Sequence, residues 1–163
     1  MSTVDDLIAN SQRYARDFEA AGASKAPALR LAVVACMDAR LNLYGLLGIG
    51  EGDVHIIRNA GGVVTDDAIR SIVISQRFLG TTEIMLVHHT DCGMLTFRDD
   101  DLRARIEAET GVRPPFTFEA FPDVDADVRQ SMARIKASPF VPHRDAIRGF
   151  VYEIETGRLR EVV

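Results

Sequence analysis

Short apolar runs alternate with stretches of helical periodicity from Leu29 onward, and this alternation constrains the fold of the 163-residue chain most strongly. Residues 29–35 form a nearly continuous apolar run with β-branched content, as expected of a parallel strand buried on both faces. Residues 54–58 and 83–89 are predicted to be the next two strands. Strands separated by helices favour an α/β fold with a mostly parallel central sheet flanked by helices.

Glycines and polar residues mark the ends of the predicted helices. We expect helices over residues 41–47, 65–80, 99–110 and 122–137, and a closing strand pair or hairpin over 147–154 and 158–162. Gly48, Gly80 and Gly111 stand at the ends of the first three helices. Glycine is the residue that most readily adopts the left-handed conformation that ends a helix.

Residues 4–20 are typical of an amphipathic helix that precedes the sheet. Residues 21–28 are mostly small and include a proline, so they predict a linker that lets this helix project from the body of its own subunit. We therefore expect one domain over 1–163, with an α/β body in 29–163. The apolar face of the helix packs on a partner chain in one interpretation and on its own core in the other.

Charge and composition exclude several classes of function. The net charge of −5 and the absence of Lys/Arg blocks argue against binding to nucleic acid or to an anionic membrane. The longest apolar runs are too short for a membrane span, and the N-terminus lacks the pattern of a signal peptide. The sequence therefore predicts a cytoplasmic protein. In that reducing compartment two cysteines 56 residues apart are more typical of ligands, nucleophiles or core residues than of a disulfide.

Three clusters of polar and reactive residues follow the three predicted parallel strands. Residues 36–40, 58–62 and 88–93 each begin where a strand ends. Because the carboxyl ends of parallel strands meet at one edge of the sheet, these loops are expected to line a single crevice.

The residue types in these loops predict a catalytic zinc site. His89 and Cys92 are three positions apart just beyond a strand, and Cys36 follows a neighbouring strand. Two thiolates and one imidazole suit zinc, and three protein ligands with an open fourth position are typical of a catalytic site. Beside a metal, the Asp38 carboxylate can ligate the ion, and Arg40 can hold Asp38 away from the ion.

Other interpretations of these residues remain. Both cysteines would be core residues in one of them and disulfide partners in another. Successive side chains of a strand point to opposite faces, so only one of His88 and His89 is expected to face the crevice. Its spacing to Cys92 favours His89, and we interpret His88 as a hydrogen-bonded residue of the core or of the surroundings of the site. Asp91 is interpreted as a turn residue.

The three motifs together resemble those of the β-class carbonic anhydrases. They are Cys36-Met-Asp-Ala-Arg40, Arg58-Asn-Ala-Gly61 and His89-Thr-Asp-Cys92-Gly, in this order and spacing. The resemblance covers nearly the whole chain and is closest to the short bacterial and archaeal members, in particular the mycobacterial ones. The reaction that it implies is the reversible hydration of CO2 to bicarbonate.

The resemblance also implies roles and partners. It implies a zinc ion held by Cys36, His89 and Cys92, an Asp38–Arg40 catalytic dyad, and a homodimer, with a dimer of dimers as a further assembly. The leading helix would embrace the other subunit.

Two departures from the family pattern are visible. Pro27 stands nine residues before the first zinc cysteine, where plant-type members have a glutamine that contacts substrate. We expect the backbone N–H groups of Gly61 and Gly62 to provide that contact instead. The chain has no tryptophan, so the regulatory anion site of the bicarbonate-inhibited subtype is not expected.

Rival functions share part of these features. A dinucleotide-binding loop at residues 48–52 does not fit the G-x-G-x-x-G spacing and precedes a strand. A cysteine phosphatase would need an arginine six positions after the cysteine, where Asn42 stands. Two alternatives remain open: a zinc hydrolase of another small linear molecule such as CS2, and a non-catalytic zinc-stabilised dimer.

Overall fold

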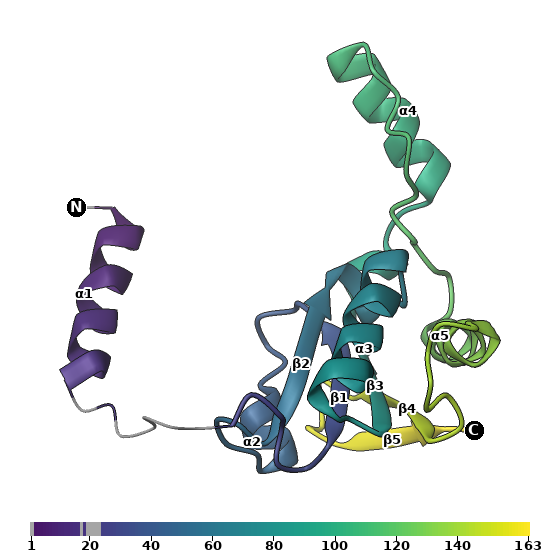
Figure 1. Cartoon of the computed structure of the whole chain (residues 1–163). Helices are drawn as coiled ribbons and strands as arrows, with labels where there is room; N and C mark the ends of the chain where they lie inside the picture. Colours follow the sequence, from purple (N-terminus) through teal and green to yellow (C-terminus); the bar gives the residue numbers. More distant parts are fainter. Residues whose placement is uncertain (1, 17, 19–23) are drawn as a thin grey trace.

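The computed structural model describes residues 2–16, 18 and 24–163, and it arranges them around a five-stranded sheet (Figure 1). The elements follow one another as α1 (Thr3–Arg16), β1 (Leu31–Cys36), α2 (Leu43–Leu47), β2 (Val54–Asn59), η1 (Ala60–Gly62), α3 (Asp66–Leu79), β3 (Glu83–His89), η2 (Gly93–Leu95), α4 (Asp99–Thr110), α5 (Val124–Ala137), β4 (Ile147–Tyr152) and β5 (Leu159–Val162). The α/β class and the order of helices and strands predicted from the sequence are confirmed. The two single-turn helices η1 and η2 were not predicted.

The strand order is β2-β1-β3-β4-β5, in which the first four strands are parallel and β5 runs antiparallel to β4. The chain begins the sheet at β1, adds β2 on one side, and then crosses over to add β3 on the other side. This reversal makes the carboxyl ends of β1 and β3 the switch point at which α/β sheets place their binding crevice. Ala35 pairs with Val87, so these two strands end at nearly the same level.

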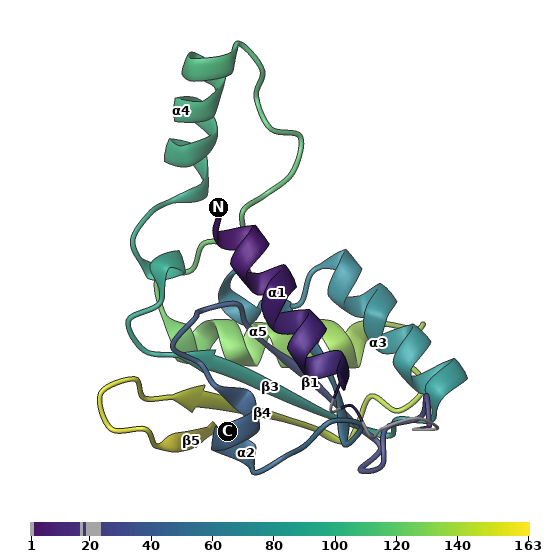
Figure 2. The same cartoon turned by 90° about the vertical axis from the view of Figure 1, so that its left-hand side faces the viewer.

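Each face of the sheet has its own core. Helices α3 and α5 lie across one face, and Figure 2 shows both on that side of the strands. Val34 and Leu86 point toward these helices, whereas their neighbours Val33 and Val87 point toward the face that α2 and the loops after β3 cover. All four side chains have no exposed surface. Burial on both faces explains the continuous apolar character of β1 in the sequence.

The helix ends follow the expected chemistry. Gly48, Gly80 and Gly111 cap α2, α3 and α4, all with left-handed backbone angles, as the sequence predicted. Thr65 accepts a hydrogen bond from the first turn of α3. Helix α5 begins just after Asp123, whose carboxylate caps it, slightly later than expected.

Helix α1 stands apart from the sheet in Figure 1 and has no buried residue. Its apolar residues Leu7 and Tyr14 are 59% and 54% exposed, and the Tyr14 hydroxyl donates a hydrogen bond to Glu51. The helix was predicted for residues 4–20, and its positions after Arg16 lie mostly outside the described residues. The first part of the predicted linker lies outside them as well. Over its described residues Thr3–Arg16, α1 does not pack on the core of its own chain.

Within the described residues, none of the helices combines the length and the apolar character needed to cross a membrane.

Candidate metal centre

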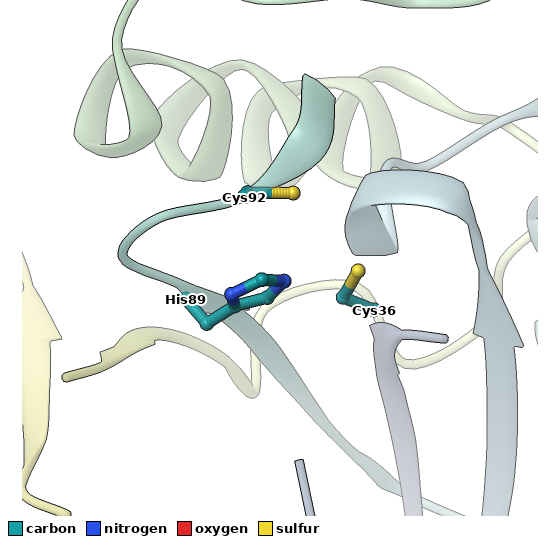
Figure 3. Close-up of side chains that lie close together, drawn as sticks. All are labelled: Cys36, His89 and Cys92. Carbon is teal, nitrogen blue, oxygen red and sulfur yellow. The ribbon is translucent and has the colours of Figure 1, made fainter. Parts of the chain in front are cut away.

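Three side chains converge at the carboxyl ends of β1 and β3. Cys36 is the last residue of β1, His89 is the last residue of β3, and Cys92 follows three positions later. One ligand atom from each, the two Sγ atoms and a ring nitrogen, lie within 4.8 Å of one another, and all three residues are buried. Figure 3 shows the two sulfur atoms and the edge of the imidazole ring directed at a common space. The sequence therefore predicted correctly that these residues meet.

Strand geometry explains why His89 faces this space and His88 does not. The ring of His88 points to the opposite face of β3, where its Nε2 lies 2.7 Å from Oδ2 of Asp127 on α5. His88 is fully buried and its Nδ1 has no hydrogen-bond partner. It is the hydrogen-bonded residue that the alternation of side chains along the strand predicts.

The hydrogen bonds of His89 leave one ring nitrogen free for a metal. Its Nδ1 lies 2.7 Å from the carbonyl oxygen of Thr90, and a carbonyl can only accept, so Nδ1 carries the proton. In the neutral ring the lone pair is then on Nε2, which is buried without a hydrogen-bond partner. A buried nitrogen without a partner is costly, and a metal ion relieves that cost. The donor set of one imidazole and two sulfurs fits zinc.

Thr90 is itself held by the neighbouring strand β4 and the turn that follows it. Its backbone N–H donates to the carbonyl of Tyr152, and its hydroxyl donates to Glu155 at 2.9 Å and accepts from the N–H of Ile154. The hairpin between β4 and β5 therefore fixes the carbonyl that orients the His89 ring. Outer hydrogen bonds of this kind set the tautomer and direction of a ligating histidine.

The local electrostatics favour a thiolate at Cys36. A hydrogen bond from Cys92 lowers the pKa of Cys36 to about 4, and the backbone N–H groups of Asp38 and Gly61 act in the same direction. The same contact raises the pKa of Cys92, because the pair retains one proton between the two sulfurs. For His89, burial is the largest single influence and would lower the pKa, but the Cys36 sulfur, the Thr90 carbonyl and the charge of Asp38 together raise it.

Asp38 and Arg40 form the predicted pair beside this group. Arg40 donates from Nε to Asp38 Oδ1 at 3.0 Å and from Nη2 to Asp38 Oδ2 at 2.8 Å. These bonds hold the pKa of Asp38 well below its usual range, so the carboxyl is ionised. Asp38 Oδ2 also lies 3.7 Å from His89 Nε2, which places the carboxylate at the border of the group of ligand atoms.

Two contacts to the loop after β1 were not predicted from the sequence. Arg58 donates to the carbonyl oxygens of Cys36 and Asp38 at 2.9 and 2.7 Å, and so it fixes the backbone that carries both side chains. Asp91 is more than a turn residue, because its carboxylate forms an ion pair with Arg40 at 2.7 Å. Its place between His89 and Cys92 was the one sequence signal for such a role.

The glycine loop after β2 packs directly on the site. Both Gly61 and Gly62 are buried with left-handed backbone angles. A Cβ atom on Gly62 would lie 2.7 Å from the backbone nitrogen of Cys36, so only glycine allows this approach. Gly61 lines a cavity of about 400 Å³ that also touches both cysteines and Asp38. The other walls of this cavity are mainly apolar and include Met37, Ala60, Met94 and Phe97.

Comparisons with known proteins agree with this geometry. Residues 31–111 match the family model described as carbonic anhydrase. The chain is 55% identical to "Beta-carbonic anhydrase 1" of Mycobacterium tuberculosis, with 99% of each chain covered. A crystal structure of the carbonic anhydrase from Streptococcus mutans superimposes with a TM-score of 0.93 at 43% identity, covering 100% of this chain and 99% of that one. More distant is a "Carbon disulfide hydrolase" of an Acidianus strain, 38% identical over 81% of this chain and 76% of that protein.

Proposed function

Because this chain belongs to the β-carbonic anhydrase family, we propose that it hydrates carbon dioxide reversibly to bicarbonate and a proton at a zinc ion held by Cys36, His89 and Cys92. It is an enzyme, a zinc-dependent lyase, and zinc is its cofactor. One observation carries the assignment of the ligands: the convergence of two buried sulfurs on a buried Nε2 atom that has no other partner.

The chemistry divides between the metal and the chain. Held by Cys36, His89 and Cys92, a zinc ion would supply a water molecule of lowered pKa, and so hydroxide near neutral pH. The apolar walls of the adjacent cavity suit carbon dioxide, which has no charge and no hydrogen to donate. Asp38 orients the nucleophilic water and passes its proton outward, and Arg40 keeps the Asp38 carboxylate ionised.

The glycine loop has a second role in this proposal. Gly61 lines the cavity, and we assign to the Gly61–Gly62 loop the contact with substrate for which Pro27 offers no side-chain donor. Gly62 lies behind Gly61 against the backbone of β1, so it supports the loop.

The test of this function uses one reduced and purified sample. We expect about one zinc ion per chain by elemental analysis, and rapid CO2 hydration in a stopped-flow indicator assay. Carbon disulfide is the second substrate to offer, because relatives at 38% identity are hydrolases of that molecule. Zinc without CO2 hydration would contradict the proposal. Turnover of CS2 alone would favour the hydrolase, and turnover of neither would favour a non-catalytic zinc protein.

The assembly follows from the exposed helix. We propose a homodimer, with a dimer of dimers as a further assembly, in which α1 of one subunit packs on the other. The support is that Val4, Leu7 and Ile8 are each more than half exposed in the single chain, and water-exposed apolar faces of this kind mark interfaces. In this layout residues 1–20 are the dimer-embracing helix, 21–28 the linker and 29–163 the catalytic body of one domain. A cytoplasmic location is proposed because the two cysteines form no disulfide with each other.

Removing residues 1–25 is expected to shift the protein towards monomer or aggregate, because the surface that α1 covers on the partner becomes exposed. Sedimentation velocity measures the change. Leu7→Ser on the apolar face is expected to weaken the dimer, and Arg13→Ser on the opposite face of α1 serves as its matched control. A truncated chain that remains a well-behaved dimer would exclude the exchange of helices.

A further inference from the structure

Asp91 has an unusual backbone conformation at a critical place in the loop after β3. Its φ angle is +53°, in the left-handed region that non-glycine residues seldom occupy. It lies between His89 and Cys92, the two ligand residues of that loop. Backbone strain of this kind persists where surrounding contacts enforce it. Both hydrogen bonds that Asp91 accepts come from Arg40.

Arg40 binds both the side chain and the backbone of Asp91. Its Nη1 donates to the Asp91 carboxylate at 2.7 Å, and its Nη2 donates to the Asp91 carbonyl oxygen at 3.0 Å. The remaining hydrogen bonds of the guanidinium go to Asp38, from Nε and from Nη2. All three guanidinium nitrogens are therefore engaged, and the planar group joins the loop after β1 to the loop after β3.

The two halves of this contact constrain each other. A guanidinium is flat and rigid, so fixing one edge fixes the direction in which the other edge presents its N–H groups. The edge toward Asp38 sets the position of Oδ2, the oxygen that lies 3.7 Å from His89 Nε2. Without Asp91 the pair of Arg40 and Asp38 can remain intact and still turn as a unit, since the Arg40 side chain is 46% exposed.

We propose that Asp91 is a positioning residue: it immobilises the Arg40 guanidinium and thereby holds the Asp38 carboxylate at the border of the metal site. The inference deepens the proposed function and rests on it, because Asp38 matters only if the chain turns over a substrate there. Asp91 is 69% exposed, and an exposed ion pair contributes little to stability. Its loss should therefore affect the reaction much more than the fold.

Two substitutions separate the side chain from the backbone. Asp91→Gly keeps the left-handed conformation and removes the carboxylate, whereas Asp91→Asn keeps an acceptor oxygen and also tolerates that conformation. In the zinc-loaded enzyme we expect Asp91→Gly to lower kcat of CO2 hydration between about tenfold and a hundredfold, with zinc content and KM unchanged. Asp91→Asn should restore most of the lost kcat.

A second readout does not depend on activity. Nuclear magnetic resonance of the guanidinium nitrogens measures rotation about the Nε–Cζ bond, which is slow when both edges are held. Rotation at Arg40 is expected to speed up in Asp91→Gly and to stay slow in Asp91→Asn. Asp67→Ala is the matched control, because Asp67 forms a 2.7 Å pair with Arg70 at comparable exposure and away from the site. It should leave kcat and the Arg40 signals unchanged.

The path of the effect is tested in the Asp38→Ala background. If Asp91 acts through Asp38, adding Asp91→Gly there should lower kcat no further. A wild-type kcat and slow Arg40 rotation in Asp91→Gly would overturn the proposal. So would loss of zinc from Asp91→Gly, or an undiminished effect without Asp38. A wild-type protein without CO2 hydration would overturn the proposed function alone, and the rotation measurements would still decide whether Asp91 immobilises Arg40.

Discussion

Replacing any one of Cys36, His89 and Cys92 with alanine is expected to reduce the zinc content from about one ion per chain to a small fraction and to abolish CO2 hydration. Each substitution leaves two protein ligands, which are too few for a stable site. The loss of activity should exceed the roughly hundredfold effect that changes around a metal's ligands produce. Elemental analysis and stopped-flow assays on the same samples measure both quantities.

His88→Ala is the matched control for the histidine. It removes an adjacent and equally buried imidazole that points to the other face of the sheet, toward Asp127. We expect this variant to keep most of its zinc, although losing the contact with Asp127 will cost stability, so its folding must be verified by circular dichroism. A folded His88→Ala protein without zinc, together with a His89→Ala protein that retains it, would reverse the assignment.

The second large effect concerns the ion pair of Asp38 and Arg40. Arg40→Ala is expected to lower CO2 hydration at pH 7 by at least about tenfold, because an unpaired Asp38 carboxylate can occupy the open position on the metal. Part of this loss should be recovered toward pH 9, where hydroxide competes better. Asp38→Ala should retain zinc and lose roughly a hundredfold in rate, since the reaction lacks an oriented proton acceptor.

The pH dependence of the wild type has a definite sign. Hydrogen bonds with Arg40 hold the pKa of Asp38 far below neutrality, and those with Asp38 and Asp91 raise the pKa of Arg40 above its usual value. Both groups are therefore charged throughout the range from pH 7 to 9 and contribute no slope. The activity should rise over this range because the nucleophilic water loses its proton, with a pKa above the value of about 7 found for three-histidine sites.

Stopped-flow pH profiles of the wild type and both variants, with zinc content checked in parallel, decide the question. Arg148→Ala is a suitable control, since Arg148 forms an exposed two-point pair with Glu161 away from the site. Profiles that are flat and equally fast in all proteins would reduce Asp38 and Arg40 to a plain structural ion pair.

Local rules explain which parts of the molecule the sequence predicts well. The ends of α3 and α4 depend on Thr65, Gly80 and Gly111, and each of these acts within a few residues of itself. The meeting of Cys36 with His89 follows from strand order, because adjacent parallel strands end at the same edge. Local sequence patterns are therefore sufficient to predict the fold class and the residues that would bind the metal.

Contacts over long sequence separations explain what the sequence leaves open. Two such contacts are the hydrogen bond from Thr90 to Glu155 and the one from Arg40 to Asp91. They depend on how two loops are positioned relative to each other, and the periodicity of the sequence carries no information on that position. The left-handed backbone at Asp91 gives no sign in the sequence either, because aspartate is common in turns of every type. Residues that support the site are thus harder to predict than residues that would bind the metal.

The support of the metal-binding loop by the final hairpin has a consequence for the order of events during folding. Thr90 acquires its partners from residues 152–155, and its hydroxyl bonds to residues 64 and 65 positions later in the chain. Such contacts carry a high entropic cost of loop closure and form late. A nascent chain on the ribosome therefore has both thiols and the imidazole before it has the means to orient them. Metal capture in the native geometry is therefore a step that follows synthesis of the β4–β5 hairpin.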